Sequence, residues 1–525
     1  MPSTLVPGSC RAGNTLPAMF NLASNLESAA ASYPEREAIV FEGRRWTYAE
    51  IEEQANQVAN GLYRAGIREG DHVALVCPNR PEFVTCYFGI LKVGAVVVCV
   101  SALLKAREIA YQLDHSDAVA MIAYGGEDMT IGDHAHEAFG QVDACLKAWF
   151  IAPRTGMAGY DELIGPEDGD FESASVSGEA TAVILYTSGT TGFPRGAELS
   201  HANIIMNVMA LARIKPPVEE GGKTLIALPL FHVMAQTCAM HLAIYNAMTI
   251  VLVQRFRAAE VIRLMLKETI TGLHGVPTMY RAILDCEEVT QAEKTVLAEQ
   301  LESFSAGGAS LLPELQKECM ETYSISMSNG YGATETSPAS CFHQTSGAIP
   351  LGSVGTAAWG VRLKIVDGAG DKVPAGEVGE LLVRGHCVMK GYYKDPQATA
   401  EVIRDGWYHT GDLARMDGKG HLFIVGRRKE LIIRGGFNVY PAEVEGMLLE
   451  HPAISQAAVV GVPDPVYGEE VKAFVTTRAG SSLKAADVVS WARNEMAAHK
   501  YPRLVEFRET LPLGPTGKVL KRMLK

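Results

Sequence analysis

"YTSGTTGFPRGAELSH", from Tyr186 to His201, follows the strand-like run "TAVIL" and mixes three glycines with small hydroxyl residues and one arginine. Glycines let backbone N–H groups approach an anion closely, and hydroxyls and a cation add further donors. A P-loop needs the spacing G-x-x-x-x-G-K-[ST], which Gly189, Gly192 and Gly196 do not have. Taken alone, the stretch is either a phosphate-holding loop of another kind or a tight turn after a strand.

The size and charge of the chain limit its class. Its 525 residues are too many for one core and indicate two to four structural units. A hydrophobic content of 47% with 20% charged residues is typical of globular proteins. The formal net charge of −13 argues against nucleic acid or an anionic membrane as the main partner, so a phosphate site would be a local exception.

Targeting and redox features point to the cytoplasm. No basic stretch followed by a long apolar core marks a signal peptide, and the longest apolar run, Val93–Leu104, is too short to span a bilayer. The ten cysteines form no C-x-x-C pair, which favours buried reduced thiols over a metal or disulfide framework. We therefore expect a soluble cytoplasmic protein without a transmembrane segment; a homodimer is left open.

The order of apolar and amphipathic segments predicts an α/β fold. Thr47 and Glu50 match a capping box at the start of a helix. Short apolar runs such as "MTIVLV" then alternate with amphipathic segments such as "AAEVIRLMLKE", which predicts parallel sheets covered by helices. We expect a large N-terminal domain over residues 1–427, including a β-rich antiparallel subdomain at about 354–427, and a small α/β C-terminal domain over 428–525.

Three further motifs accompany the glycine-rich stretch. They are "SNGYGATETSP" at Ser328–Pro338, "GWYHTGDLARMDGKGHLFIVGRRKELIIRGGFNVYPAEVE" at Gly406–Glu445 and "GPTGKVLKR" at Gly514–Arg522. In this order and spacing, the four motifs resemble the adenylate-forming superfamily, which includes acyl-CoA synthetases, nonribosomal-peptide adenylation domains and luciferases. The resemblance covers nearly the whole chain and favours the phosphate-holding interpretation of the opening stretch.

The resemblance implies a two-step reaction. A carboxylate attacks the α-phosphate of ATP and releases pyrophosphate; a thiol then attacks the acyl-adenylate and releases AMP. Because the first nucleophile is already an anion, this step needs positioning and neutralisation of phosphate charge by Mg²⁺ and basic side chains. The catalytic residues implied by the resemblance are Lys518, Thr334, Glu335, His232 and Arg195.

Each implied role attaches to a motif position. Thr334 contacts the α-phosphate, Lys518 bridges this phosphate and the substrate carboxylate, and Glu335 is the Mg²⁺ ligand together with Thr187. Arg195 stands where most relatives have lysine, which keeps the charge but changes the geometry. The ATP- and AMP-binding set is Thr187, Ser188, Gly189, Thr190, Thr191, Gly192, Gly307, Gly308, Ala309, Asn329, Gly330, Tyr331, Gly332, Thr334, Asp412 and Arg427.

Within this set, Tyr331 is implied to stack on adenine, Asp412 to bind the ribose hydroxyls, and Arg427 to reach the ribose or a phosphate. Lys429 occupies the hinge about which the C-terminal domain swings between the two half-reactions. The implied coenzyme A contacts are Arg434, Gly435, Gly436 and Phe437. The implied acyl pocket comprises Phe231, His232, Met234, Ala306, Gly307, Gly332 and Ala333.

The pocket residues indicate the class of acid. No aspartate follows Phe231 closely to hold a substrate ammonium, and no carrier domain follows the small domain, so coenzyme A is the expected acceptor. No arginine stands ready for a second carboxylate, which favours an apolar monocarboxylate. We expect a medium- or long-chain fatty acid. A benzoate- or cinnamate-type acid remains open, as does a nucleotide-binding regulator that has lost the chemistry.

Overall fold

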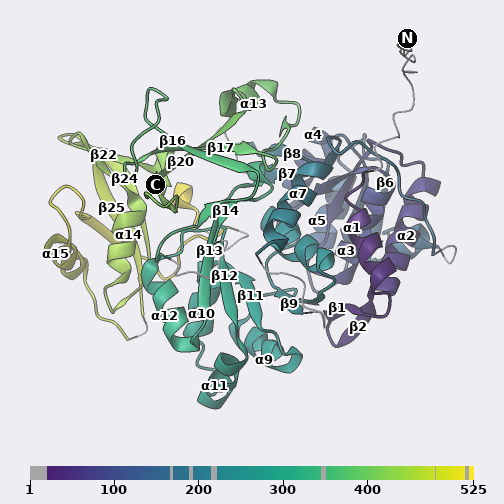
Figure 1. Cartoon of the computed structure of the whole chain (residues 1–525), viewed down its shortest axis with the longest axis horizontal. Coiled ribbons are helices and arrows are strands. Elements are labelled where there is room, and N and C mark those ends of the chain that lie inside the picture. Colours follow the sequence, from purple (N-terminus) through teal and green to yellow (C-terminus); the bar gives the residue numbers. More distant parts are fainter. Residues whose placement is uncertain are drawn as a thin grey trace, which may run out of the picture.

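The computed structural model describes residues 20–165, 169–187, 193–214, 222–343, 350–478, 480–514 and 519–524. The described residues form four sheets. The seven-stranded sheet and the nine-stranded sheet share one hydrophobic core with the helices that cover them. In Figure 1 the seven-stranded sheet (mostly blue) lies on the right and the C-terminal unit (yellow) on the left; the nine-stranded sheet extends from β11, β12 and β13 near the middle to β1 and β2 at the lower right.

The seven-stranded sheet has the order β18-β8-β7-β4-β3-β5-β6. Its strands from β7 to β6 are parallel. At one edge, β8 pairs antiparallel with β7, and β18 pairs antiparallel with β8. The bounds are β3 His72–Val76, β4 Val96–Cys99, β5 Ala118–Tyr124, β6 Lys147–Ile151, β7 Thr181–Thr187, β8 Arg195–Ser200 and β18 Gly391–Tyr392.

The nine-stranded sheet has the order β15-β14-β13-β12-β11-β9-β10-β1-β2, parallel from β13 to β1 and antiparallel at both ends. The carboxyl ends of β11, β12 and β13 therefore lie at one edge, where ligands of parallel sheets gather. The bounds are β1 Glu37–Phe41, β2 Arg44–Thr47, β9 Lys223–Ile226, β10 Thr249–Leu252, β11 Gly272–Gly275, β12 Ser303–Ala306, β13 Ser326–Gly332, β14 Ala339–Phe342 and β15 Thr356–Ala357.

Local sequence explains where the covering helices begin. Thr47 accepts from the Glu50 amide and Glu50 accepts from the Thr47 amide, so the predicted capping box of α2 is confirmed. The amphipathic segment "AAEVIRLMLKE" forms α9. The helices of the N-terminal part are α1 Ser24–Ser32, α2 Tyr48–Arg64, α3 Pro81–Lys92, α4 Ala106–His115, α5 Ile131–Phe139, α6 Tyr160–Ile164, α7 His201–Ala212, α8 Leu242–Tyr245, α9 Ala258–Glu268, α10 Pro277–Leu284, α11 Gln291–Gln300 and α12 Pro313–Tyr323.

Two short non-α helices lie near the strand ends. A π-helix, η1 (Ala235–His241), runs directly into α8, and a 3₁₀ turn, η2 (Thr334–Thr336), follows β13. The turn before η2 requires glycine, because a Cβ on Gly332 would lie 1.5 Å from the Pro338 carbonyl oxygen. The sequence gave no expectation of a π-helix, which is a rare element found mostly at functional sites.

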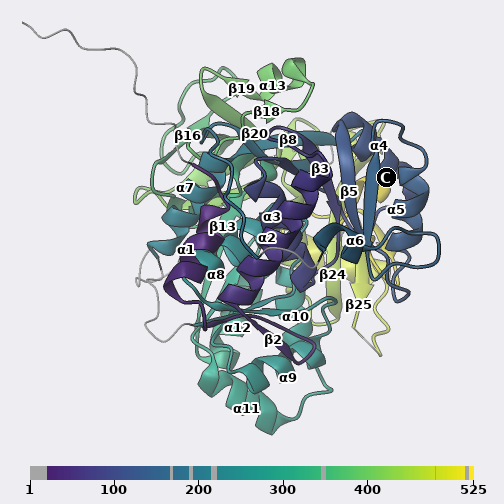
Figure 2. The ribbon, with the colours of Figure 1, turned by 90° about the vertical axis from the view of Figure 1, so that its right-hand side faces the viewer.

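The third sheet is antiparallel, as expected from the glycine turns after residue 354, and begins the transition to the C-terminal unit. Figure 2 shows this region and α13 (Pro396–Val402) at the top of the molecule, with α9 and α11 at the bottom. Its strands are β16 Val361–Val366, β17 Gly379–Gly385, β19 Ile403–Arg404, β20 Trp407–Met416 and β21 Leu422–Arg427.

The C-terminal unit has its own sheet and its own apolar clusters. The short helix η3 (Arg428–Glu430) joins it to β21. Its other elements are β22 Ile432–Arg434, β23 Phe437–Val439, α14 Pro441–Leu449, β24 Ile454–Asp464, β25 Gly468–Thr477, α15 Ala485–Glu495, β26 Leu504–Phe507 and η4 Lys521–Met523. The predicted fold class, helix-covered parallel sheets with a β-rich subdomain and a small α/β unit, is confirmed.

Candidate active site

One cavity of about 2360 Å³ brings most of the predicted site residues together. It lies at the carboxyl ends of β11, β12 and β13 and is also lined by β20, β21 and the C-terminal unit. Its lining includes Thr187, Arg195, Phe231, His232, Met234, Ala306, Gly307, Gly308, Ala309, Asn329, Gly330, Tyr331, Gly332, Ala333, Thr334, Glu335, Asp412, Arg427 and Lys429. Segments separated by more than 200 residues thus share one space.

Other predicted site residues lie elsewhere. Ser188, Gly189, Thr190, Thr191, Gly192 and Lys518 lie outside the described residues. The flanks of Lys518, from Val519 to Arg522, line the cavity. Arg434, Gly435, Gly436 and Phe437 form the β22–β23 turn, which is not part of the cavity lining in the described chain.

The Arg434 side chain is engaged within the C-terminal unit. Its Nε and Nη2 donate to Glu470 at 2.7 and 2.9 Å, and its guanidinium lies 3.9 Å from the Tyr467 ring centroid. These contacts hold the arginine head away from the cavity. Phe437 is exposed at the turn and stacks on His499.

Arg195 and Thr187 lie directly opposite each other on β8 and β7. Arg195 Nε lies 3.3 Å from Asp395 Oδ2, and its guanidinium lies 5.5 Å from the Tyr392 ring centroid. Thr187 ends β7 and Arg195 begins β8, so the two residues flank the glycine-rich stretch in the sequence. Asp395 and Tyr392 orient the Arg195 guanidinium.

Glu335, on η2, is held by two hydroxyl groups. Tyr392 Oη donates to Glu335 Oε1 at 2.9 Å, and Thr187 Oγ1 lies 3.4 Å from the same oxygen. Burial raises the pKa of Tyr392, and the Glu335 charge raises it further, so the phenol stays protonated and acts as the donor. Tyr392 and Asp395 were missed from the sequence, because only the pairing of β18 with β8 brings residues 392–395 beside Arg195.

The carboxylate and hydroxyl at this point suit a Mg²⁺ ion shared with phosphate. Mg²⁺ prefers oxygen ligands and is usually held by one or two carboxylates together with substrate phosphates. Within the described parts of the chain, no group of three or more His, Cys, Asp or Glu residues is placed to hold a metal alone. Glu335 and Thr187 therefore fit such an ion only as part of a nucleotide complex.

Asp412 is held by two side chains, Tyr331 and Arg427. Tyr331 Oη donates to Oδ2 at 2.5 Å, and Arg427 Nε lies 3.1 Å from Oδ1. Burial raises the pKa of Tyr331 well above its ordinary value, and Asp412 adds to the shift, so this phenol also remains a donor. The three residues predicted to surround adenine and ribose are thus joined by one hydrogen bond and one ion pair.

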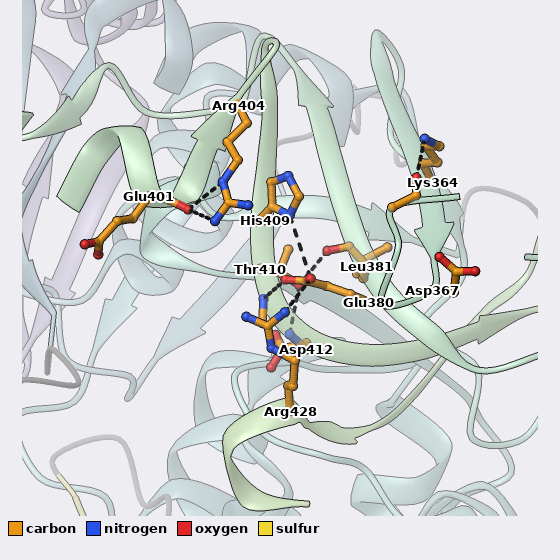
Figure 3. Close-up of polar contacts among 12 residues, drawn as sticks. Lys364, Asp367, Glu380, Leu381, Glu401, Arg404, His409, Thr410, Asp412 and Arg428 are labelled. Atoms are coloured by element: carbon orange, nitrogen blue, oxygen red, sulfur yellow. Dashed lines mark hydrogen bonds and ion pairs between the residues drawn. The ribbon is translucent and has the colours of Figure 1, made fainter. Parts of the chain in front are cut away.

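Glu380 on β17 ties this part of the cavity to the start of the C-terminal unit (Figure 3). Its Oε2 lies 2.9 Å from Arg428 Nη1 and 3.7 Å from His409 Nδ1, and its Oε1 accepts from the Gly411 amide at 3.2 Å. Arg428 is the first residue of η3 and precedes Lys429. The predicted hinge is thus anchored on its N-terminal side by an ion pair.

His232 lies in the turn that leads into η1. The Met234 amide donates to His232 Nδ1 at 3.3 Å, which orients the imidazole ring. A Cβ on Gly307 would lie 3.0 Å from the Met234 Cε, so the Gly307–Gly308 turn and Met234 are in close contact. These residues line the part of the cavity where the acyl group is predicted to begin.

Comparison with known proteins identifies the family. The profile of the AMP-binding enzyme family matches residues 26–393, and that of the AMP-binding enzyme C-terminal domain matches residues 443–518. The chain belongs to the AMP-binding enzyme family. The predicted resemblance to adenylate-forming acyl-CoA synthetases is therefore confirmed.

Curated members of this family are similar over almost the full length. A feruloyl-CoA synthase from an Amycolatopsis species is 34% identical over 489 residues, covering 93% of this chain and 95% of that protein. A long-chain-fatty-acid–CoA ligase from Escherichia coli is 32% identical over 541 aligned residues, covering 96% of this chain and 94% of that protein.

Solved structures of family members agree with this fold. ATP-bound MatB from Rhodopseudomonas palustris superposes with a TM-score of 0.88 at 28% identity, covering 96% of this chain and 98% of that one. The anthranilate CoA ligase AuaEII, solved with anthranoyl-AMP, also gives 0.88, at 27% identity and 97% coverage of both chains. This AMP-binding enzyme is an ATP-dependent, AMP-forming acid–CoA ligase, as predicted.

None of the described helices has the length and apolar character that crossing a bilayer requires. The cytoplasmic location stays a prediction.

Proposed function

We propose that this ligase activates a medium- or long-chain fatty acid as acyl-AMP and transfers the acyl group to coenzyme A. The observation that carries the proposal is a row of cavity-lining residues spaced by four: Met234, Cys238, Leu242 and Asn246. The row runs from the residue before η1 to the residue after α8. At the rise per residue of a helix, the row is roughly 15 to 18 Å long, a length that suits an extended acyl chain.

The first half-reaction follows from the charges around the reacting phosphates. The glycine-rich loop and Arg195 would hold the leaving pyrophosphate, while Thr334 would contact the α-phosphate. Glu335 and Thr187 would hold Mg²⁺, which would neutralise phosphate charge. Lys518 would bridge the substrate carboxylate and the α-phosphate, which brings two anions together for the attack.

Different residues of the cavity would hold the nucleoside and the acyl group. Tyr331 would face adenine, with Gly307–Ala309 and Asn329–Gly332 forming the surrounding turns, and Asp412 and Arg427 would bind the ribose. Asp412 can accept hydrogen bonds from a diol because a carboxylate has several acceptor sites, even while Tyr331 and Arg427 hold it. His232, Phe231, Met234, Ala306 and Ala333 would border the acyl group at its carboxyl end.

For the second half-reaction, we propose that the part of the C-terminal domain (428–525) that follows Lys429 swings about this residue. This motion would remove Lys518 and bring Arg434–Phe437 toward the thiol. The Arg428–Glu380 ion pair, on the N-terminal side of Lys429, would stay in place during the swing. The division at residue 427 falls where β21 ends and η3 begins.

An aromatic acid is the second candidate. It is favoured by the similarity to the Amycolatopsis feruloyl-CoA synthase and to the anthranilate CoA ligase structure. A planar acid would be shorter and would occupy only the part of the cavity next to Met234 and the Gly307–Gly308 turn. Pocket shape near the distal end, rather than the shared motifs, separates the two candidates.

An acid panel tests the proposal directly. AMP release is measured with ATP, Mg²⁺ and coenzyme A for saturated C8, C12 and C16 acids and for benzoate, cinnamate and ferulate, with Lys518→Ala as the inactive control. We expect the highest kcat/KM among the aliphatic acids. Turnover of the aryl acids without turnover of the C8–C16 acids would reject the fatty-acid assignment in favour of the second candidate.

A further inference from the structure

One wall of the acyl cavity carries two rows of polar positions. The register of β11, β12 and β13 pairs His274 with Ser305 and Ser305 with Ser328, which makes one row across three strands. Two residues toward the strand starts, Gly272 pairs with Ser303 and Ser303 with Ser326, which makes a second row. All six residues line the cavity.

The orientation of these rows follows from strand alternation. The residues between the rows, Leu273, Phe304 and Met327, are almost fully buried, so they occupy the opposite face of the sheet. The row residues His274, Ser305 and Ser328 are partly exposed on the cavity side. The cavity is therefore bounded on its sheet side by an imidazole and hydroxyls.

The facing wall is different in character. Met234, Cys238 and Leu242 line the cavity from η1 and α8, and all three are apolar or weakly polar. An unsubstituted hydrocarbon would match this wall but would displace water from the sheet wall without replacing its hydrogen bonds. A serine hydroxyl has one donor and two acceptor sites, so Ser305 and Ser328 can bind a ligand while keeping a protein contact.

The depth of the first row can be worked out from the strands. Ser305 lies two residues before Gly307, and the Gly307 amide donates to the Gly275 carbonyl, directly after His274, at 3.3 Å. At the rise of a parallel strand, the His274–Ser305 row lies about 7 Å below the Gly307–Gly308 turn, and the Ser303 row about 13 Å below it. The first row thus faces the body of the acid rather than its carboxylate.

We propose that the His274–Ser305–Ser328 row selects acids that carry a hydroxyl substituent on the chain or ring, about 7 Å from the carboxyl group. His274 and Ser305 would then determine specificity. This proposal rests on the acid–CoA ligase function and on the acyl position proposed above. The recognised chemistry is a hydroxyl facing an imidazole and a serine. It can come from a hydroxylated aliphatic chain or from a phenolic ring.

Matched substrate pairs test the inference. The first pair is dodecanoate and a dodecanoate with a hydroxyl near the middle of the chain; the second is cinnamate and 4-hydroxycinnamate. We expect the wild-type enzyme to favour the hydroxylated member of at least one pair by about tenfold in kcat/KM, the size of effect expected for one well-made hydrogen bond. The pair that shows the preference identifies the aliphatic or the aromatic source.

Variants separate hydrogen bonding from shape. Ser305→Ala and His274→Leu should bring the preference to within about threefold, mainly by lowering kcat/KM for the hydroxylated acid, and His274→Gln should retain part of it. Cys238→Ala, on the facing wall, is the matched control and should change both members of a pair by the same factor. The melting temperature of each variant checks that it is folded.

The outcomes are distinct. Turnover of all four acids with no preference in the wild type, or a preference that Ser305→Ala and His274→Leu leave intact, overturns the role of this row while the ligase function stands. Absence of turnover with every acid, including the C8–C16 panel, contradicts the acid assignment proposed above, and the inference fails with it.

Discussion

The hydroxyl of Tyr392 is predicted to hold Glu335 in place for the ATP half-reaction. Tyr392→Phe removes the 2.9 Å hydrogen bond to Glu335 Oε1 and leaves the ring between Arg195 and the carboxylate. A hydrogen bond to a charged acceptor contributes about 1.5–3 kcal/mol, and each 1.4 kcal/mol is a factor of ten. The remaining contact from Thr187 Oγ1, at 3.4 Å, is too long to compensate fully.

We therefore expect Tyr392→Phe to slow ATP–pyrophosphate exchange about tenfold to one hundredfold. Thioester formation from a supplied acyl-adenylate should stay within about twofold of the wild type, because that step does not use the triphosphate. The two rates are measured separately on the same preparation, with the melting temperature as a check on folding.

Tyr393→Phe is the matched control. Tyr393 is the next residue, and its Oη donates to Asp117 Oδ2 at 2.8 Å. Among the described residues, Tyr393 is not part of the cavity lining. This variant should leave both half-reactions unchanged. Unchanged pyrophosphate exchange in Tyr392→Phe, or an equal loss in both half-reactions, would refute the argument that this phenol acts through Glu335.

Three further predictions concern other parts of the chain. Lys518→Ala should abolish ATP–pyrophosphate exchange and largely spare thioester formation from supplied acyl-adenylate; equal loss of both would refute the division of labour between the two orientations. Arg195→Lys should leave the KM for ATP within about threefold, measured by AMP release, because the guanidinium already uses Nε on Asp395; a rise above tenfold would show that its planar fork contacts phosphate. Burial lowers the pKa of His201 to about 4 and of His241 to about 3, so both stay neutral when folded, whereas the unfolded chain binds their protons below about pH 6.5. The free energy of unfolding should therefore fall as the pH drops from about 6.5 toward 4, by up to about 1.4 kcal/mol per pH unit for each histidine. Urea titrations at pH 7, 6 and 5 measure this slope, and His241→Asn should reduce it. A free energy of unfolding in the wild type that does not change with pH would contradict the prediction.

The parts of the fold that the sequence predicted are those with local causes. The capping box of α2 needs only Thr47 and Glu50 in one helical turn, and α9 follows from an apolar stripe with a period near 3.6. The antiparallel sheet after residue 354 is indicated by glycine-containing turns between short strands. The order of the family motifs can be read directly from the sequence, so the sequence also predicted the reaction class.

The parts that the sequence could not predict depend on pairing between distant strands. Tyr392 and Asp395 lie beside Arg195 only because β18 adds to the edge of β8, nearly 200 residues earlier in the chain. The antiparallel edges of both large sheets were likewise not expected. No spacing in the sequence encodes these contacts.

The sequence by itself determined the class of chemistry: a glycine-rich stretch, a threonine–glutamate pair, an aspartate predicted to bind ribose and a lysine near the C-terminus, in one order. Only the tertiary structure decided which side chains line the cavity proposed for the acid. The row of His274, Ser305 and Ser328 exists because three parallel strands pair in one register. That register is set by burial of Leu273, Phe304 and Met327 on the other face, since a slip by one residue would exchange the two faces and expose them.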